Sequence, residues 1–465
     1  MDPAALTPAY IEEQRRLRNL RKANKKKVQP PQVVKSKFIK RPFLEIPNIN
    51  SNPDGFFIKV MSYNVLAQTL IRRSLFPTNG DALKWSWRSK ALLEEFKHYD
   101  ADILCLQEVD YIQYNSFWLK EFSNLGYTTK FYRSKSKNHG VAIVYRSSIF
   151  ECRHLCFINY DTDIVSETLP SATAITQNIG LLVYLQFTST ILKKYPHLSK
   201  RNGVVIGSTH LYWKPFGSFE RTRQTYILLH RYKEFLLSLN AVLENSKGFY
   251  TFMCGDFNSQ PFDSPYLSIV AKPINYHGRH TTVLACSLDH FQKAESLKEE
   301  EAEEKEEEEE DEGGEERDEE SKDPSPDTFD ATEDQLRSIQ QLQDTHNSLN
   351  MRAISLYSVG YKLVHPENSG LDNDRGEPIF SNWANHWQGL LDYIFVISNW
   401  EINKDKNYFN NIDSVEDLVE HQEIKLTRLL RLPLPVEMGK EPNGQPRLNQ
   451  YPSDHLCLMA EIELV

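Results

Sequence analysis

Four carboxylates and two histidines lie where apparent strands run into loops, and each could take part in acid–base chemistry or bind a metal ion. Two asparagines accompany them. In chain order, these candidate side chains are Asn64, Glu108, His210, Asp256, Asn258, Asp392, Asp454 and His455. A single carboxylate at a strand end usually caps a turn, and a single histidine is usually a satisfied, half-buried side chain. Only the joint pattern therefore favours a catalytic site.

The four carboxylates have no obvious cationic neighbour in the sequence. They would repel one another if the fold brought them together, unless a cation or a histidine separated them. No cysteine belongs to the set, and oxygen ligands suit a hard divalent ion better than zinc. The residue types therefore favour a site for a hard divalent cation.

Short apolar segments alternate with amphipathic segments along the chain, and these elements must position the candidate side chains. Strands are predicted over residues 58–63, 103–106, 140–145, 180–187, 204–209, 250–254, 356–361, 391–398 and 457–463. Helices are predicted over residues 89–98 and 221–239. The alternation indicates an α/β core.

The order Asn, Glu, His, Asp-x-Asn, Asp, Asp-His resembles that of the endonuclease/exonuclease/phosphatase family. Within the family, the sequence is most similar to the nocturnin-like RNA nucleases and to the yeast Ngl RNA exonucleases. The resemblance covers roughly residues 56 to 290 and 350 to 465, and six motifs in one order make it specific. It implies a four-layered α/β sandwich, in which two packed mixed β-sheets are flanked by helices.

The resemblance also implies roles for the matching side chains. Glu108, in a Leu-Gln-Glu motif, would be the principal magnesium ligand, and Mn²⁺ could replace Mg²⁺. Asn64 and Asp454 would complete the metal and phosphate environment. Asp256 of Gly-Asp-Phe-Asn would orient or deprotonate the attacking water, while Asn258 would hold the phosphate.

Three further matches concern the scissile phosphate. His455 would contact it, Asp392 would orient that histidine, and His210 would be a second histidine nearby. Magnesium and histidine would neutralise the charge that grows in the transition state, and a carboxylate near water would supply the base. A carboxylate beside His455 would raise its basicity and fix its tautomer.

A slot for a base is implied by the deadenylase branch of the family, which has a His-x-x-Trp-x-Pro segment and an aromatic residue before Lys-Gly. Here Trp213 and Pro215 match the first segment, and Trp387, followed by Gln-Gly, corresponds to the second. Stacking on Trp387 would contribute about 1 to 3 kcal/mol per base. The alternative is that Trp387 is ordinary core near Trp383. Asn382 resembles the family's asparagine near the phosphate.

The function implied by the resemblance is a magnesium-dependent 3′-5′ RNA exonuclease. It would act on single-stranded RNA 3′ ends, release nucleoside monophosphates and mature rRNA 3′ ends, especially of 5.8S rRNA. A poly(A)-shortening deadenylase is the alternative, although Asn138-His139-Gly140 departs from the Asp-Gly turn of poly(A)-specific members. A phosphatase or phosphodiesterase for a small substrate is a further alternative. A binding module without activity would need a broken metal set, and here every position is filled.

The formal net charge of −10 combines three very different regions. Residues 1–42 hold twelve Lys/Arg against three Asp/Glu, a charge of +9. Residues 295–334 hold twenty-three Asp/Glu against four Lys/Arg, a charge of −19. The rest of the chain is neutral overall, so the global charge does not identify a partner.

These charges, with the motifs, predict the domain organisation. Residues 1–55 are expected to form a flexible basic arm, and residues 56–465 a single catalytic domain. A disordered acidic insert at about 295–344 interrupts that domain, because so charged a segment cannot bury apolar surface. The arm is a disordered tail, a nuclear address or a phosphate-binding extension.

Other classes of protein and partner are excluded by length and composition. Residues 1–55 are too short and polar for the leucine-rich repeats that precede this domain in the large deadenylase-complex subunit, so docking in that complex is not expected. No apolar run approaches the roughly 18 to 20 residues of a membrane span. Six scattered cysteines and the lack of a signal peptide indicate the nucleus, nucleolus or cytoplasm. A monomer is expected.

Overall fold

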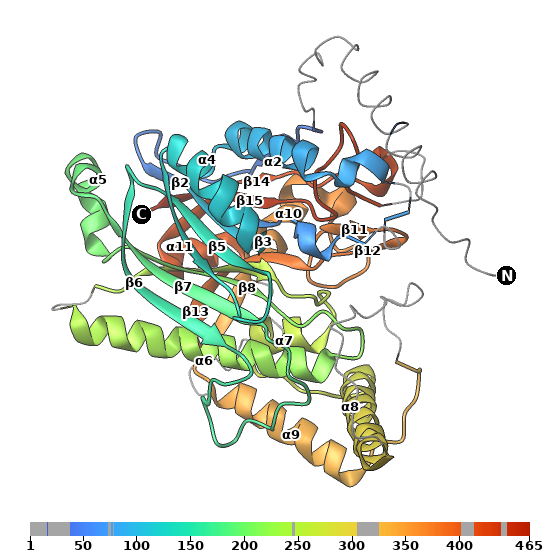
Figure 1. The fold of residues 1–465 in the computed structure, drawn as a ribbon. Helices are drawn as coiled ribbons and strands as arrows, with labels where there is room; N and C mark the ends of the chain where they lie inside the picture. The colour runs from blue at the N-terminus through green and yellow to red at the C-terminus, as the bar shows by residue number, and fades with distance from the viewer. Residues whose placement is uncertain are drawn as a thin grey trace. The chain divides into compact units, whose positions relative to one another are not determined.

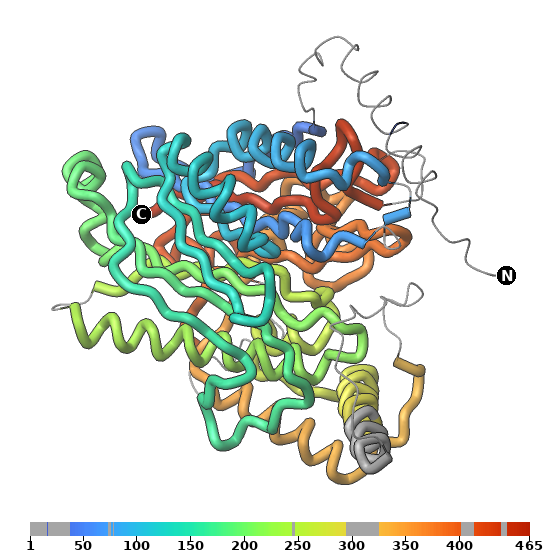
Figure 2. Tube along the Cα trace, in the orientation of Figure 1, coloured from blue at the N-terminus to red at the C-terminus, as the bar shows by residue number. Residues whose placement is uncertain are grey.

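The computed structural model describes residues 16, 38–72, 76–77, 79–243, 247–304, 325–400, 413–438 and 444–465. For residues 294–304 only the backbone is described. One compact unit extends from Phe38 to Val465. Two mixed β-sheets form its centre, as the ribbon and the chain trace show (Figures 1 and 2).

The first sheet has seven strands in the order β1-β14-β15-β2-β3-β5-β4. Their bounds are β1 (Phe43–Glu45), β2 (Phe56–Asn64), β3 (Ile103–Asp110), β4 (Tyr127–Tyr132), β5 (His139–Arg146), β14 (Ile424–Leu430) and β15 (Leu458–Leu464). Strands β2 and β3 are parallel, with Asn64 opposite Gln107, and β15 runs antiparallel to β2. The first and last parts of the chain therefore share one sheet.

The second sheet has six strands in the order β10-β13-β9-β8-β7-β6. Their bounds are β6 (Phe150–Asn159), β7 (Ile179–Phe187), β8 (Val204–His210), β9 (Tyr250–Asp256), β10 (Met351–Ser355) and β13 (Asp392–Asn399). Strands β8 and β9 are parallel, and β13 is antiparallel to β9. A separate hairpin joins β11 (Asn382–Ala384) to β12 (Trp387–Gly389).

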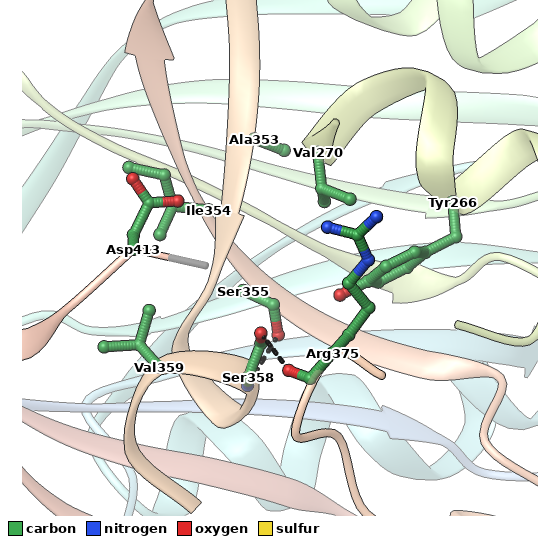
Figure 3. A pocket seen from close by; sticks show the side chains of 9 residues that line it. All are labelled: Tyr266, Val270, Ala353, Ile354, Ser355, Ser358, Val359, Arg375 and Asp413. Atoms are coloured by element: carbon green, nitrogen blue, oxygen red, sulfur yellow. Dashed lines mark hydrogen bonds between the residues drawn. The ribbon is translucent and has the colours of Figure 1, made fainter. Parts of the chain in front are cut away.

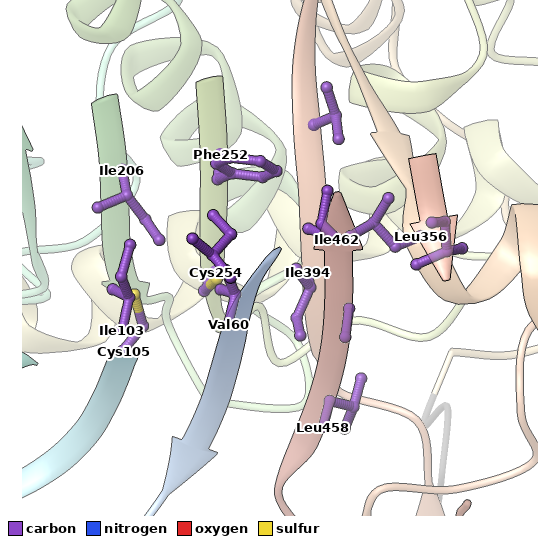
Figure 4. Packing of buried hydrophobic residues seen from close by; sticks show 14 of the residues in the cluster. Val60, Ile103, Cys105, Ile206, Phe252, Cys254, Leu356, Ile394, Leu458 and Ile462 are labelled. Carbon is purple, nitrogen blue, oxygen red and sulfur yellow. The ribbon is translucent and has the colours of Figure 1, made fainter. Parts of the chain in front are cut away.

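The two sheets pack face to face over a continuous apolar core (Figure 4). Val60 and Ile103 of the first sheet belong to the same buried cluster as Ile206 and Phe252 of the second. Alternate residues of the central strands point to the outer face, where helices cover them. Strands buried on both faces read as near-continuous apolar runs, which is why the sequence pattern reveals them.

Helices cover the outer face of each sheet. Those on the first sheet are α2 (Trp85–Tyr99) and α4 (Leu119–Asn124), and the short α3 (Tyr111–Gln113) stacks Tyr111 on Phe131 of β4. Those on the second are α6 (Ser218–Val242), α7 (Ser264–Val270), α8 (Arg279–Glu304) and α9 (Glu333–Ser348). The remaining α-helices are α5 (Ser189–Lys194), α10 (Leu356–Val364) and α11 (Val415–Gln422). The order of layers is helix, sheet, sheet, helix, so the predicted four-layered sandwich is confirmed.

The predicted strand over residues 356–361 is wrong, because this segment is helix α10. Its side chains Leu356, Tyr357 and Tyr361 are buried. The Ser355 hydroxyl accepts a hydrogen bond from the backbone nitrogen of Ser358 at 3.3 Å and so caps the helix. A short apolar run does not distinguish a strand from a buried helix. The other predicted strands and both predicted helices are present, most of them with longer bounds.

The acidic insert is shorter than predicted, because helices occupy both of its ends. Residues 295–304 continue α8, and residues 333–344 belong to α9. A capping box at Thr332 begins α9, and Ile339 and Leu342 are buried in the core beneath it. These two apolar side chains bind the helix to the domain despite its charged composition. Residues 305–324 lie outside the described residues.

The predicted arm is also too long at its carboxyl end. Phe43 in β1 pairs with Leu430 in β14, so residues 43–45 belong to the first sheet. Arg41 is only 4% exposed, and its guanidinium donates to the backbone oxygen of Cys457 at 2.8 Å. The domain thus includes residues that the charge pattern assigned to the arm. Within the described parts of the chain, no helix is long and apolar enough to cross a membrane.

Candidate active site

The candidate side chains meet at one end of both sheets. The parallel pairs β2/β3 and β8/β9 have their carboxyl ends there, whereas β13 and β15 run the other way and begin there. Chain direction therefore brings together residues from six distant segments. They are Asn64, Glu108, His210, Asp256, Asp392, Asp454 and His455.

Asn64 connects the two sheets at this end. Its side-chain nitrogen donates to Glu108 Oε1 at 3.0 Å and to Asp256 Oδ2 at 2.9 Å. Its side-chain oxygen accepts from the backbone nitrogen of Leu66 at 3.0 Å. The amide is thereby oriented with its nitrogen toward the two carboxylates, and it holds them close to each other.

Glu108 lies at an irregularity of β3. Its φ angle is +55°, and the pairing of β3 with β5 shifts register between Leu106 and Val109. A positive φ is unfavourable for a residue with a side chain, so the surrounding sheet must hold this conformation. The Glu108 carboxylate accepts from the backbone nitrogen of Ala67 at 2.9 Å. Burial alone would raise the pKa of Glu108, but nearby imidazoles and its hydrogen bonds lower it to about 2.

His455 lies between two carboxylates. Its Nδ1 is 2.7 Å from Asp392 Oδ2, and its Nε2 is 3.6 Å from Asp256 Oδ2. Burial alone would lower the pKa of His455, but Asp392 and Asp256 raise it to about 10. The imidazole is thus held as a cation at neutral pH. The Ser381 hydroxyl donates to Asp392 Oδ2 at 2.6 Å and fixes the carboxylate that orients the ring.

Asp256 is at the centre of the cluster. Its Oδ1 accepts from the backbone nitrogen of Asn258 at 2.9 Å, and its Oδ2 lies 3.6 Å from His210 Nε2. Burial beside Asp392 raises the pKa of Asp256, against the effect of the His455 imidazolium. A buried carboxylate with a raised pKa is suited to accept a proton.

His210 and Asn258 complete this wall of the site. Burial lowers the pKa of His210 to about 4, so its ring is neutral at physiological pH. Asn258 has a φ angle of +46°, and its side-chain nitrogen donates to the backbone oxygen of Leu211 at 2.9 Å. The turn after β9 is therefore fixed from two directions.

Asn382, the first residue of β11, and Asp454, in the segment before β15, belong to the same region of the fold. Both are buried, and Asn382 forms an isolated β-bridge with His455. The backbone oxygen of Asp454 accepts from the nitrogen of Trp383 at 2.8 Å. The Ser453 hydroxyl donates to the backbone oxygen of Asn64 at 2.7 Å, which attaches this segment to the end of β2.

The donor set fits a hard divalent cation. Asn64 holds the carboxylates of Glu108 and Asp256 close together, and the carboxylate of Asp454 is buried. Ligand atoms of Asp256, Asp392 and His455 also lie within 4.8 Å of one another, but the His455 imidazolium already lies between these two carboxylates. Among the described residues, Asp392 Oδ1 is buried and accepts no hydrogen bond. Buried carboxylate oxygens of this kind are typical ligands of magnesium or manganese.

A sequence model of the Endonuclease/Exonuclease/phosphatase family matches residues 61–455. The chain belongs to the endonuclease/exonuclease/phosphatase family. It is 45% identical to the RNA exonuclease NGL2 of Saccharomyces cerevisiae over 470 residues. This alignment covers 99% of this chain and 89% of that protein. The probable RNA exonuclease NGL3 of the same yeast is 38% identical over 437 residues, 92% of this chain and 82% of that protein.

A solved structure shows the same fold at lower identity. The crystal structure of ANGEL2, a 2′,3′-cyclic phosphatase, in complex with adenosine-2′,3′-vanadate superposes with a TM-score of 0.59. The identity is 22%, over 92% of this chain and 99% of that chain. The predictions of the family, of its likeness to the yeast Ngl proteins, of the layered fold and of an enzyme are confirmed.

Two residues that support the site of this family member were missed by sequence reasoning. Arg88 of α2 is fully buried and donates to the backbone oxygens of Leu66, at 2.6 Å, and Pro452, at 2.7 Å. Nothing in the sequence of a surface-type helix indicates this role. The second residue is Ser381, which donates to Asp392. Its position directly before the predicted Asn382 is the only feature of the sequence that could have indicated this role.

The residues predicted to form a base slot lie in β12 and in the loop before α6. Trp387 lies in β12, and its ring covers Gly389, where an added Cβ would be 2.6 Å from it. Trp213 is half-buried, and Pro215 is exposed in the loop before α6. The Arg221 guanidinium donates to the Pro215 backbone oxygen at 3.4 Å. Trp387 is half-buried, so it does not belong to the fully buried core.

A small pocket elsewhere in the domain contains none of the predicted site residues. It lies between α7, β10 and α10, and Tyr266, Ser355, Ser358 and Arg375 are among the residues that line it (Figure 3). The Ser358 hydroxyl donates to the Arg375 backbone oxygen at 2.5 Å across its floor. The predicted site residues of this family member therefore lie at the sheet ends and not in this pocket.

Proposed function

We propose that the chain is a magnesium-dependent 3′-5′ RNA exonuclease that hydrolyses phosphodiesters to nucleoside monophosphates. The arrangement of Asp392, His455 and Asp256 next to Glu108 carries this proposal. It combines a fixed imidazolium, a carboxylate of raised pKa and a second carboxylate held by Asn64. The names of the two yeast relatives support RNA as the substrate.

The magnesium ion, held by Glu108 and Asp454 with Asn64 orienting the former, would neutralise charge on the phosphate and activate water. Manganese would serve in its place. Asp256 accepts the proton of the attacking water, because its carboxylate is the one whose pKa is raised. Asn64 fixes its second oxygen by a hydrogen bond.

The phosphate is bound by the remaining polar groups. His455, held by Asp392, donates a hydrogen bond to a phosphate oxygen and opposes the negative charge that develops during attack. Neutral His210 and the amides of Asn258 and Asn382 supply further donors. His455 and Asn258 are held by their hydrogen bonds to Asp392 and Leu211 before the substrate binds, so little reorganisation of these two side chains accompanies the reaction.

The proposed cellular role is maturation of rRNA 3′ ends, especially of 5.8S rRNA, in the nucleolus. The likeness to the RNA exonuclease NGL2 over nearly the whole chain supports an RNA substrate. Poly(A) shortening in cytoplasmic mRNA turnover is the alternative role. The protein would act as a monomer, outside the leucine-rich-repeat deadenylase complex. Sequencing of RNA 3′ ends from cells that lack the protein would separate the two roles.

The activity is tested with 3′-labelled single-stranded RNA and magnesium. We expect stepwise release of nucleoside monophosphates, and a fall in kcat of at least about 100-fold for Glu108→Ala. Glu94→Ala, which removes an exposed carboxylate of α2, is the matched control. Unchanged cleavage by Glu108→Ala would overturn the metal assignment.

A panel of substrates tests the alternatives. Preference for an adenosine tail over a mixed tail would indicate a deadenylase, with Trp213, Pro215 and Trp387 as its base slot. Faster turnover of a small phosphorylated substrate than of RNA would indicate a phosphatase or phosphodiesterase. We expect RNA to be the best substrate, with Trp387→Ala raising KM more than it lowers kcat.

A further inference from the structure

The loop between β4 and β5, residues 133–138, is folded around one side chain. Nη1 of Arg133 donates to the backbone oxygens of Ser134, Lys135 and Lys137 at 3.2, 2.9 and 2.6 Å. The same guanidinium lies 4.4 Å from the ring centroid of Tyr111, which directly follows β3. The loop is therefore attached to the end of the strand that carries Glu108.

Backbone contacts place Lys137 at the edge of the site. The Tyr111 nitrogen donates to the Asn138 oxygen at 2.8 Å, and His139 pairs with Asp110, two residues after Glu108. The Lys137 side chain is half-buried there. Burial lowers the pKa of Lys137 to about 8, while the carboxylates of Asp161 and Glu108 raise it, and Lys137 in turn lowers the pKa of His139 and of His210. These neighbours come from both sheets, since His139 begins β5 and His210 ends β8. Lys137 thus lies where the two walls of the site approach each other.

Within the described ranges, the Lys137 ammonium makes no hydrogen bond or ion pair. Asp161, its strongest acidic neighbour, is already occupied, because its carboxylate accepts from the backbone nitrogens of Thr176 and Gln177 at 3.0 and 2.6 Å. Glu108 is likewise held by Asn64 and Ala67. The lysine is therefore a half-buried cation whose nearest acids are engaged elsewhere.

The charge balance of the site calls for such a cation. The cluster holds Glu108, Asp256, Asp392 and Asp454, and its imidazolium, His455, is shared between two of these carboxylates. An RNA strand adds a negative charge with every nucleotide, and the domain outside the charged terminal and insert regions is neutral. An unpaired ammonium beside the cluster is suited to a phosphate oxygen.

We propose that Lys137 binds a backbone phosphate of the RNA strand in the active site, through a direct ion pair with a non-bridging oxygen. This assignment rests on the proposed RNA exonuclease function and adds a substrate-binding residue to it. Arg133 is the positioning residue, since it folds the loop that presents the lysine. Recognition of a phosphate carries no base information, so the contact strengthens binding of all sequences alike.

The test measures binding apart from cleavage. A fluorescein-labelled single-stranded RNA is titrated, between about 50 and 200 mM salt, into protein carrying Asp256→Asn, with and without Lys137→Met. The methionine keeps an apolar stem of similar length. We expect Kd to rise about tenfold for RNA of any sequence, and the slope of log K against log salt to fall by about 0.7, the value for one phosphate contact.

Two further variants sharpen the result. Lys137→Arg should recover most of the affinity and the salt dependence, which excludes misfolding as the cause of weaker binding. Lys135→Met removes an exposed lysine of the same loop and should change Kd by less than about twofold. An unchanged Kd and slope for Lys137→Met, or an equal effect of Lys135→Met, would overturn the assignment.

The outcome for Lys137 is distinguishable from that for the proposed function. If the unsubstituted enzyme cleaves RNA while Lys137→Met binds it normally, the lysine assignment alone is wrong. If the unsubstituted enzyme does not cleave RNA with any divalent ion, the exonuclease proposal is wrong. If Lys137→Met still weakens RNA binding in that case, the lysine remains assigned as a phosphate contact.

Discussion

His455 is the residue whose chemical state the fold controls most strongly. It would be a weak base in isolation, but two buried carboxylates from the opposite sheet hold it as an imidazolium. The imidazolium in turn offsets the free-energy cost of burying these two carboxylates, because it lies between them. Charge, burial and position in this cluster therefore depend on one another.

Asp392→Asn tests this dependence. The amide removes the negative charge that raises the pKa of His455, so the ring should lose its proton near neutral pH and its orientation should be less fixed. We expect kcat on RNA to fall by about 100-fold to 10,000-fold, with the alkaline limb of the pH profile displaced to lower pH. Asp374→Asn, which changes an exposed carboxylate, is the control. A kcat within about threefold of the original enzyme would contradict the role.

At the scale of elements, the site depends on how closely β8 and β9 pack. Gly255 precedes Asp256, and a Cβ there would lie 2.4 Å from the backbone oxygen of Thr209 in β8. Gly207 is also close-packed, but an added Cβ would meet the side-chain ends of Met253, at 2.3 Å, and Leu182, at 2.6 Å. A backbone atom cannot move aside as readily as the end of a flexible side chain.

The two alanine substitutions should therefore differ. We expect Gly255→Ala to lower the free energy of unfolding by about 1 to 3 kcal/mol and to reduce activity, because the strand must shift beside Asp256. Gly207→Ala should cost less in both measurements. Urea unfolding and steady-state kinetics on the pair provide the comparison, and an equal or larger effect of Gly207→Ala would contradict the packing argument.

Helix α9 also shows how an element can be hidden by composition. Its sequence is polar and follows a strongly acidic segment, yet the capping box at Thr332 and the buried Ile339 and Leu342 attach it to the second sheet's helical layer. Helix α10 shows the converse, because its apolar run imitates a strand. The local sequence pattern therefore predicts the secondary structure of such segments incorrectly, because a few buried contacts determine whether they form a helix, a strand or a loop.

At the scale of the whole molecule, Glu377 couples stability to pH. It is fully buried, Tyr266 donates to its Oε1 at 2.8 Å, and burial raises its pKa from 4.5 to about 7. A carboxyl with a raised pKa stabilises the fold only while it is protonated. This contribution is complete below pH 4.5 and is lost as pH rises through 7, a change of about 3 kcal/mol.

Glu377→Gln should remove this dependence, because the neutral amide keeps an acceptor for Tyr266. We expect the variant to be more stable than the original protein at pH 8 and similar to it at pH 5, as measured by urea unfolding across that range. Glu94→Gln, on the surface of α2, should leave the pH dependence unchanged. Parallel pH profiles for Glu377→Gln and the original protein would contradict the raised pKa.

The separation of charge along the chain gives a second prediction at this scale. Residues 1–37 contain ten Lys/Arg and three Asp/Glu. Their removal should weaken RNA binding and flatten its salt dependence by about 0.7 for each phosphate that the arm neutralises, while urea unfolding of the remaining domain is unchanged. The measurement is fluorescence anisotropy over a salt series. A truncated protein with the original slope would show that the arm does not contact RNA.

The sequence by itself determined which functional groups are available and the order in which they occur. It also determined the central strands. A strand that is buried on both faces is a nearly continuous run of apolar residues, and such a run can be recognised from the sequence alone. The motif order was sufficient to predict the family, the four layers and the side chains that meet at the sheet ends.

Only the tertiary structure decided how these groups act on one another. The direction of Asn64, the charge of His455, the bulge at Glu108 and the place of Lys137 depend on contacts between residues far apart in the chain. The pKa of a buried group is set by its desolvation and by charges within a few ångströms, and neither is encoded in neighbouring letters. The chemistry of the site therefore arises when the two sheets meet.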